Sequence, residues 1–133
     1  MTKWVYLIIG GVAGTVARYL LSGMVSEAAG AGFPYGTFVV NLIGCFLIGL
    51  FSALADEKFI FGPEMKLLLI AGFCGAFTTF STFMLETANL IKDGEGMRAF
   101  DNVLLSVVAG FLVFRLGMLA GEFTNTFSWE TFL

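Results

Sequence analysis

The sequence has no histidine, two cysteines and 13% charged residues, whereas 58% of its 133 residues are apolar. Soluble domains carry about 25% charged and roughly 45–50% apolar residues. A soluble domain of this length needs a polar coat, which so few charges do not supply. The absence of histidine also excludes imidazole metal ligation and histidine acid/base chemistry. The composition therefore predicts a chain whose outer solvent is lipid.

Other absences narrow the function further. Cys45 and Cys74 form no C-x-x-C motif and lie in apolar stretches, where cysteine is ordinary packing. No glycine-rich phosphate loop follows a predicted strand. The net charge of −3 gives no basic patch, so we expect no nucleic-acid partner. No nucleophile pairs with a plausible base, so we do not expect an enzyme.

Four apolar stretches hold only three of the charged residues, namely Arg18, Glu86 and Arg115. The stretches are residues 4–22, 35–55, 67–91 and 103–121. At about 1.5 Å per residue, each is long enough to cross a hydrocarbon core of roughly 30 Å. The sequence therefore predicts an all-α, multi-pass membrane protein, with residues 1–133 forming one four-helix domain.

The basic residues are almost evenly divided between the two membrane faces. Four spans place both termini on one side, with Lys3, Lys58, Lys66 and Arg115; the opposite side has Arg18, Lys92 and Arg98. Orientation follows an excess of basic residues on the cytoplasmic side, which is nearly missing here. The count predicts insertion in both orientations and antiparallel dimers. The alternative is a single orientation fixed by Lys3 and the lysines of the loop after the second span.

Glycines form two stripes that predict close helix contacts. Gly10, Gly14 and Arg18 share one face of the first span, and Gly110, Gly117 and Gly121 form a similar stripe on the fourth. Small residues at this spacing let helix backbones touch. Four helices hardly enclose a path through the bilayer, so a transporting unit needs two copies. We interpret the stripes as evidence of assembly and not of activity.

The third span contains poor helix-forming sequence at its centre. Gly72 and Gly75 precede T-T-F-S-T-F at residues 78–83, a run of β-branched and hydroxyl side chains. We expect the helix to break near residues 75–79. Carbonyls at such a break need partners. A buried monovalent cation is one solution, and hydroxyls of the same run or a trapped water are the alternatives.

Polar residues elsewhere in the spans normally face inward, because exposing them to lipid is costly. Thr37 and Asn41 lie one turn apart on the second span, and Asn102 precedes Ser106 by four residues at the start of the fourth. Phe80 and Phe83 fall on nearly one face of the third span. From spacing alone, these rings are better explained by packing or lipid contact than by function.

Three segments together resemble the small bacterial fluoride channels of the Fluc (CrcB) family. They are G-x-x-G-x-x-A-R-Y at residues 11–19, P-Y-G-T-F-V-V-N-L-I-G at 34–44 and G-F-C-G-A-F-T-T-F-S-T-F at 72–83. The resemblance implies an antiparallel, dual-topology homodimer in the bacterial plasma (inner) membrane. It also implies export of fluoride from the cytoplasm down its gradient through two pathways, with one structural sodium ion at the dimer centre.

The resemblance also implies a role for each matching residue. Asn41 is the pore-lining amide, and Phe80 and Phe83 are the aromatic pair beside the ion path. Gly75 and Thr78 offer backbone carbonyls to sodium, two from each subunit. The remaining residues are the path hydroxyls Thr37, Ser81, Thr82 and Ser106, the acid Glu86 near the exit and Arg18, which draws anions toward a vestibule.

The residue types suit fluoride, which holds water tightly and needs close donors such as amide and hydroxyl groups. Two other classes remain as alternatives. A small dual-topology exporter of multidrug or guanidinium cations needs an acid in the first span, which has Arg18 and no acid. A non-transporting assembly subunit explains the glycine stripes but not the combination of Asn41 with the hydroxyls and phenylalanines.

Overall fold

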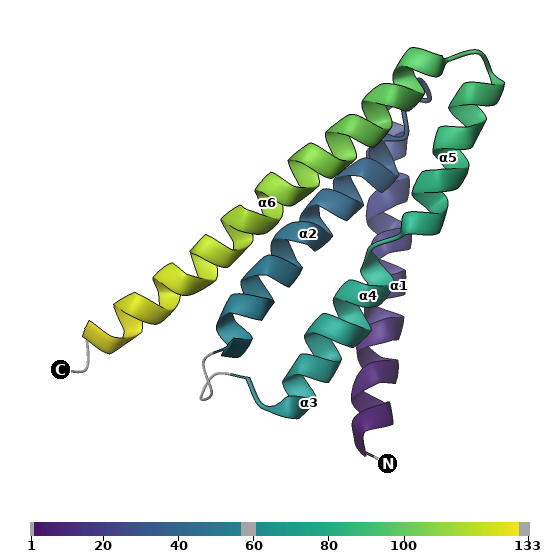
Figure 1. The fold of residues 1–133 in the computed structure, drawn as a ribbon. Helices are drawn as coiled ribbons and strands as arrows, with labels where there is room; N and C mark the ends of the chain where they lie inside the picture. The colour runs from purple at the N-terminus through teal and green to yellow at the C-terminus, as the bar shows by residue number, and fades with distance from the viewer. Residues whose placement is uncertain (1, 57–60, 131–133) are drawn as a thin grey trace.

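The computed structural model describes residues 2–56 and 61–130, and side chains as far as residue 124. Over this part of the chain the regular structure is entirely helical (Figure 1). The elements are α1 (Thr2–Ala29), α2 (Tyr35–Asp56), α3 (Pro63–Lys66), the π-helix η1 (Leu67–Cys74), α4 (Gly75–Phe77), α5 (Phe80–Lys92) and α6 (Gly96–Glu130). Lys58, which the charge count includes, lies outside the described residues.

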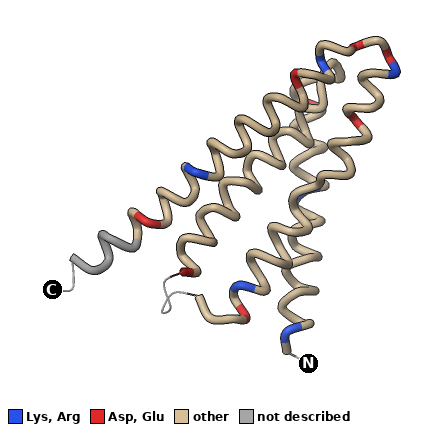
Figure 2. The backbone as a smooth tube through the Cα atoms, in the orientation of Figure 1, with Lys and Arg blue, Asp and Glu red and all other residues tan. Residues whose placement is uncertain are grey.

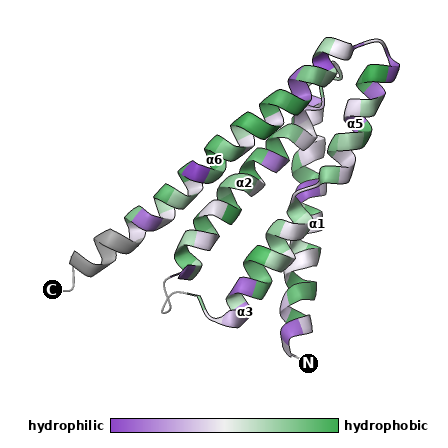
Figure 3. Cartoon of the chain, viewed as in Figure 1, coloured by the Kyte–Doolittle hydropathy of each residue, from purple (hydrophilic) through white to green (hydrophobic). Residues whose placement is uncertain are grey.

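Four helical stretches are long and apolar enough to cross a membrane. They cover Thr2–Ala29, Tyr35–Asp56, Pro63–Lys92 and Gly96–Thr124. Figure 3 shows hydrophobic residues along the helix lengths, and Figure 2 shows most charges near the helix ends. Both termini lie at the same end of the bundle (Figure 1). The prediction of an all-helical chain with four helices long and apolar enough to cross a membrane is confirmed over the described residues.

The helices extend beyond the apolar stretches that predicted them. Hydropathy marks only the segment that suits lipid, whereas helical hydrogen bonding continues through polar end turns until a residue stops it. Two of these stops are glycines with positive φ, which residues with a side chain rarely adopt: Gly30 after α1 (φ 84°) and Gly94 after α5 (φ 79°). The helix after the first stop, α2, begins directly behind Pro34.

Glycine contacts join the helices into two close pairs, which we call the α1 seam and the α6 seam. In the α1 seam, Gly10 and Gly14 lie against backbone atoms of η1, including those of Phe73. In the α6 seam, Gly117 lies against Phe46 of α2, and Gly49 of α2 lies against Phe114 of α6. A Cβ at any of these glycines would collide with backbone.

These seams correct our interpretation of the glycine stripes. Their spacing favours assembly of copies, but Gly10 and Gly14 meet a helix of the same chain, and so do Gly110, Gly117 and Gly121. Spacing identifies a face that can pack closely and does not identify its partner. The stripes therefore explain how one subunit folds, and they carry no information on contacts between copies.

Large apolar side chains remain exposed over much of α1 and α6. Ile8, Val12 and Val16 of α1 are more than half exposed, as are Val107 and Phe111 of α6. The apolar core is small and includes Val40, Phe77 and Phe83. Such a surface is unusual for a soluble monomer and is normal where lipid or another apolar surface covers the helices.

Candidate functional site

The third span loses its helical backbone at two residues. Thr78 (φ −83°, ψ 154°) and Thr79 (φ −146°, ψ 112°) are extended, and they stand between α4 and α5. We call these two residues the α4–α5 junction. Thr79 caps α5, because its Oγ1 accepts from Thr82 N at 3.3 Å and donates to Thr82 Oγ1 at 2.9 Å. The local sequence thus supplies its own helix start.

The side-chain amide of Asn41, on α2, binds the backbone of the junction. Thr79 N donates to Asn41 Oδ1 at 2.9 Å, and Asn41 Nδ2 donates to Thr79 O at 3.2 Å. An amide presents a donor beside an acceptor, which matches both groups of one extended residue. The second Nδ2 hydrogen has no acceptor among the residues that the structure describes. Asn41 therefore holds the junction in place and still has one N–H group available to bind another acceptor.

Arg18, on α1, binds a backbone group two residues before the junction. Its Nε donates to the carbonyl oxygen of Ala76 at 3.0 Å. In a continuous helix that oxygen would accept from the amide of Phe80, four residues on. The extended backbone at Thr78 and Thr79 prevents this bond, and Arg18 replaces it.

Other carbonyls near the junction have lost their helical partners. The amide of Thr79, four residues after Gly75, donates to Asn41 instead. The amide of Thr82, four residues after Thr78, donates to the side chain of Thr79 instead. Within the described part of the chain, the carbonyl oxygens of Gly75 and Thr78 accept no other hydrogen bond. The carbonyl oxygen of Phe77 has no donor there either. These oxygens at membrane depth are suited to a cation or a water molecule.

A first hollow, with a volume of about 300 Å³, lies beside the junction. We call it the phenylalanine hollow, and no charged residue lines it. Its lining is Asn41, Gly44, Cys45, Ile48, Cys74, Thr78, Thr79, Phe80, Phe83, Ser106 and Val107. It brings together residues from α2, η1, the α4–α5 junction, α5 and α6 that are far apart in the sequence.

The two phenylalanines of this hollow have different surroundings. Their ring centroids are 5.8 Å apart and the rings are inclined at 45°. Phe83 is 6% exposed, whereas Phe80 is 73% exposed. Burial of Phe83 fits a packing role as well as a functional one, but the exposed position of Phe80 contributes little to the core of this chain.

Ser106 adds a hydroxyl that has no partner. Its Oγ is buried and forms no hydrogen bond in the described structure. Such a group costs free energy unless a water molecule or ligand satisfies it. By contrast, Asn102, one turn earlier on α6, donates from Nδ2 to Thr87 Oγ1 at 2.9 Å, and Thr87 donates to the carbonyl of Phe83 at 2.7 Å. This buried chain ties α5 to α6 beside Phe83.

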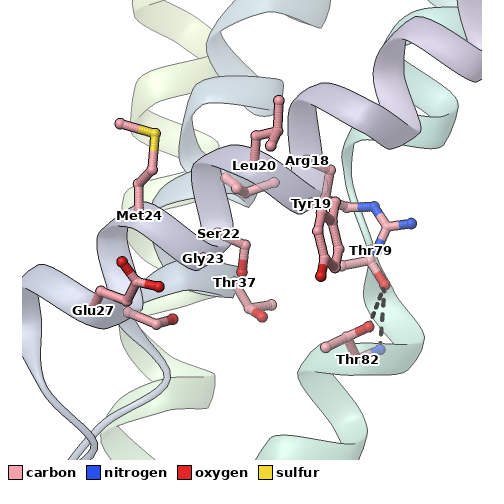
Figure 4. Close-up of a pocket in the computed structure, with 12 residues that line it drawn as sticks. Arg18, Tyr19, Leu20, Ser22, Gly23, Met24, Glu27, Thr37, Thr79 and Thr82 are labelled. Carbon is pink, nitrogen blue, oxygen red and sulfur yellow. Dashed lines mark hydrogen bonds between the residues drawn. The ribbon is translucent and has the colours of Figure 1, made fainter.

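The second hollow, of about 470 Å³, also borders the junction (Figure 4). We call it the arginine hollow. Its lining is Arg18, Tyr19, Leu20, Ser22, Gly23, Met24, Ser26, Glu27, Thr37, Val40, Thr79 and Thr82. Figure 4 shows Arg18 extending from α1 to the neighbourhood of Thr79. Thr79 therefore borders both the arginine hollow and the phenylalanine hollow.

The third hollow, of about 370 Å³, contains Glu86 and is called the glutamate hollow. Its lining is Ser26, Gly30, Ala31, Phe33, Pro34, Glu86, Asn89, Leu90 and Asp93. Thr37 Oγ1 donates to Glu86 Oε1 at 2.8 Å, while Oε2 is buried without a partner among the described residues. Ser26 borders both this hollow and the arginine hollow.

The structure thus distributes most of the predicted path residues over these three hollows. Asn41, Phe80, Phe83 and Ser106 share the phenylalanine hollow; Arg18, Thr37 and Thr82 line the arginine hollow; and Glu86 lines the glutamate hollow. Ser81 is exposed and borders none of these three, with its Oγ 3.5 Å from Thr79 Oγ1. Thr78 lines the phenylalanine hollow, and Gly75 does not.

Sequence reasoning missed Thr79 and Thr87. Thr79 lay inside the hydroxyl run but had no assigned role, although the pairing of its backbone with Asn41 organises the junction. Two features of the sequence could have indicated this pairing: Asn41, an amide residue in the apolar second span, and the poorly helix-forming run at residues 78–83 in the third. Nothing in the sequence indicated the role of Thr87 except that it carries a hydroxyl group and lies one helical turn after Phe83.

Four apolar helical stretches, one of them interrupted by a polar junction with hollows beside it, are typical of a multi-pass membrane protein. Relatives identify its family. The sequence model of the CrcB-like (Camphor Resistance, CrcB) family matches residues 5–118, and the chain belongs to this family.

Several relatives share the name fluoride-specific ion channel FluC. The protein of Maridesulfovibrio salexigens is 44% identical, over 92% of this chain and 97% of its own length. That of Methylocella silvestris is 43% identical over 92% and 95%. That of Chlorobaculum tepidum is 49% identical over 85% and 89%.

Proposed function

We propose that this protein is a fluoride-selective channel that lets fluoride leave the cytoplasm down its gradient across the bacterial inner membrane. The observation that carries the proposal is the phenylalanine hollow. It places a free amide N–H of Asn41 and the unpartnered hydroxyl of Ser106 in one uncharged hollow beside two phenylalanines. The names of the relatives support fluoride as the ion.

Fluoride suits this combination for physical reasons. It is small and strongly hydrated, so a path must replace water with donors at short range, and amide and hydroxyl groups are such donors. The rings of Phe80 and Phe83 add positively polarised edges, which attract an anion weakly. A lysine or arginine there would bind the ion too strongly for rapid exit. An uncharged hollow with several weak donors therefore favours passage.

The other hollows complete a route. Arg18 and Glu27 both line the arginine hollow, and the guanidinium group of Arg18 is the group there that attracts an anion. The hydroxyls of Thr37 and Thr82 lie in the same hollow, and that of Ser81 lies beside Thr79. Glu86 marks the glutamate hollow near the end of the span. The position of Thr79, which borders both the arginine hollow and the phenylalanine hollow, supports a path from the arginine hollow past the junction.

We further propose that two copies assemble as an antiparallel dimer with two pathways. The nearly equal numbers of basic residues on the two faces and the broad apolar surface of α1 and α6 support this. A tag at the C-terminus should then report both membrane faces in comparable amounts, and two lysines added to one loop should shift the ratio. Labelling of one face alone would exclude the antiparallel dimer.

A structural sodium ion fits the α4–α5 junction. Carbonyl oxygens of unwound membrane helices bind sodium well. Gly75 and Thr78 have carbonyls without donors among the described residues, as does Phe77, so the chemistry of the site agrees with the sodium ligands that the family resemblance implies. In the dimer, Gly75 and Thr78 of each subunit would hold one ion, which would join the two junctions.

Exchange of the buffer cation tests the sodium proposal. Protein dialysed for a long period against lithium or N-methylglucamine should lose dimer content and fluoride flux, and both should return when sodium is added. Potassium serves as the control for ionic strength. Unchanged dimer content and flux after complete removal of sodium, checked by atomic emission, would contradict the proposal.

Ion efflux from proteoliposomes tests the proposed function. Liposomes loaded with fluoride should empty rapidly, while those loaded with chloride should match protein-free liposomes. Guanidinium uptake driven by a proton gradient tests the exporter alternative and should be absent. Equal fluoride efflux with and without protein, from a preparation shown to be folded, would favour the non-transporting alternative.

A further inference from the structure

Arg18 has a structural partner that differs from the role expected of it. Its Nε donates to Ala76 O at 3.0 Å, across a sequence separation of 58 residues. Ala76 lies in the last helical turn before the α4–α5 junction. The amide that would normally satisfy this carbonyl belongs to Phe80, on the far side of two extended residues. Arg18 thus occupies the place of a missing helical hydrogen bond.

The charge of Arg18 is also suited to this position. The helical segment Pro63–Phe77 ends at the junction, and the carbonyls at a helix C-terminus carry partial negative charge. A cation there is stabilised, and more so where water is scarce. The ion pair found in the described structure joins Arg98 to Glu95 and leaves Arg18 out. The helix end is therefore the compensating partner that the structure gives Arg18.

Arg18 and Asn41 bind the backbone at and before the junction from two different helices. Arg18, on α1, binds the residue before Phe77, and Asn41, on α2, binds Thr79. Between them they fix the backbone on both sides of Thr78, whose carbonyl and hollow-lining side chain belong to the proposed ion site and path. Loss of the Arg18 contact releases the backbone before Thr78, and loss of the Asn41 contact releases the backbone after it.

We propose that Arg18 is a positioning residue that holds the α4–α5 junction in its extended form by capping α4 through Ala76. Its effect on conduction rests on the proposed channel function, whereas its effect on the junction does not. An arginine that only attracts anions would need its charge and not its Nε–H. An arginine that positions the junction needs a donor at the place of Nε.

Two substitutions separate these roles. The Nε2 of glutamine follows the same number of bonds from the backbone as the Nε of arginine, so Arg18→Gln keeps a donor and removes the charge. Arg18→Lys keeps the charge and puts a methylene group at that place. Arg98→Gln and Arg98→Lys are matched controls, because Arg98 lies in an exposed ion pair away from the junction.

Fluoride flux is measured against fluoride concentration, at low and high ionic strength, per amount of folded protein. For Arg18→Gln we expect a higher half-saturating concentration, most evident at low salt, and a maximal flux within about threefold of the wild type. For Arg18→Lys we expect a maximal flux about tenfold lower at every salt concentration, because the cap is lost. The reverse pattern, or wild-type behaviour of both variants, would overturn the proposal.

Amide hydrogen exchange provides a reading that does not depend on conduction. In nanodiscs, the peptide covering residues 75–82 should exchange about tenfold faster in Arg18→Lys than in the wild type, and nearly normally in Arg18→Gln. Both Arg98 variants should match the wild type. Wild-type protection in Arg18→Lys would refute the positioning role even if the protein conducts no fluoride. If the wild type conducts no fluoride, the proposed function fails and this exchange comparison still decides the inference.

Discussion

Gly10 of the α1 seam and Thr79 of the junction both lie within membrane spans, yet their contacts are of opposite kinds. Around Gly10, backbone atoms of Leu68, Gly72 and Phe73 come so close that no side chain fits. Around Thr79, the side chain of Asn41 on another helix supplies two hydrogen bonds, and Thr79 lines two hollows. Close packing of backbones needs no polar partners, whereas an extended segment in a membrane needs them for its amide and carbonyl groups.

The comparison separates what builds the fold from what gives it chemistry. The seams bring α1 against η1 and α2 against α6 without leaving polar groups to satisfy. This rigid arrangement holds Arg18 and Asn41 at the positions from which they reach the junction. Substitutions in the seams should therefore act on folding, and those around the phenylalanine hollow should act on conduction.

The largest effect is expected at Asn41. Replacing it with Asp puts a negative charge in the anion path and sets a carboxylate oxygen, in place of an N–H donor, against the carbonyl of Thr79. Fluoride flux should fall by about a hundredfold or more, since repulsion of like charges is strong where the dielectric constant is low. The measurement is efflux from proteoliposomes, normalised to folded protein by gel filtration. Flux near the wild-type rate would show that Asn41 does not line the ion path.

The next effect concerns the seams. Gly10→Ala places a Cβ against backbone of η1, so the helices must separate, at a cost of about 1–3 kcal/mol in the free energy of unfolding. Gly11→Ala is the control, because apart from its chain neighbours and the backbone of its own helix no described atom lies within 4 Å of the Cβ position there. Unfolding in detergent should show Gly10→Ala destabilised and Gly11→Ala unchanged or slightly stabilised. Equal stability of the two variants would refute the close contact.

The smallest effect on stability is expected at Ser106. Ser106→Ala removes a buried hydroxyl that has no partner in the described structure, so stability should stay within about 0.5 kcal/mol of the wild type or rise. Fluoride flux should nevertheless fall several-fold, because a donor of the path is lost. Thermal unfolding and efflux of the same preparation make the comparison. A clear loss of stability with normal flux would show that Ser106 is structural.

Much of the fold could be predicted because lipid imposes simple constraints. The near absence of charge marked four helices, and Gly75 followed by hydroxyl and β-branched residues directed attention to the region where Thr78 and Thr79 are extended. The π-helical hydrogen bonding of Leu67–Cys74 was not predicted, because this apolar segment suits an α-helix equally well.

The site was predictable as a set of residues but not as an arrangement. The family resemblance named Asn41 and Arg18, but their hydrogen bonds go to backbone groups 38 and 58 residues away. Backbone groups are the same at every residue, so sequence gives no sign of which one a side chain will meet. For the same reason the partners of the glycine stripes could not be read from their spacing.

Fluoride flux in Phe80→Ile and Phe83→Ile is the most direct test of the claim that conduction passes the phenylalanine hollow. Isoleucine keeps apolar bulk, at a cost in stability under about 1.5 kcal/mol, but removes the polarised ring edge. Per folded protein, flux should fall by about tenfold or more in both variants, well beyond the loss of stability. The account would be contradicted by near-normal flux in both isoleucine variants together with lower stability in Phe83→Ala, which opens a cavity. That result would show that the two rings serve only to pack the structure.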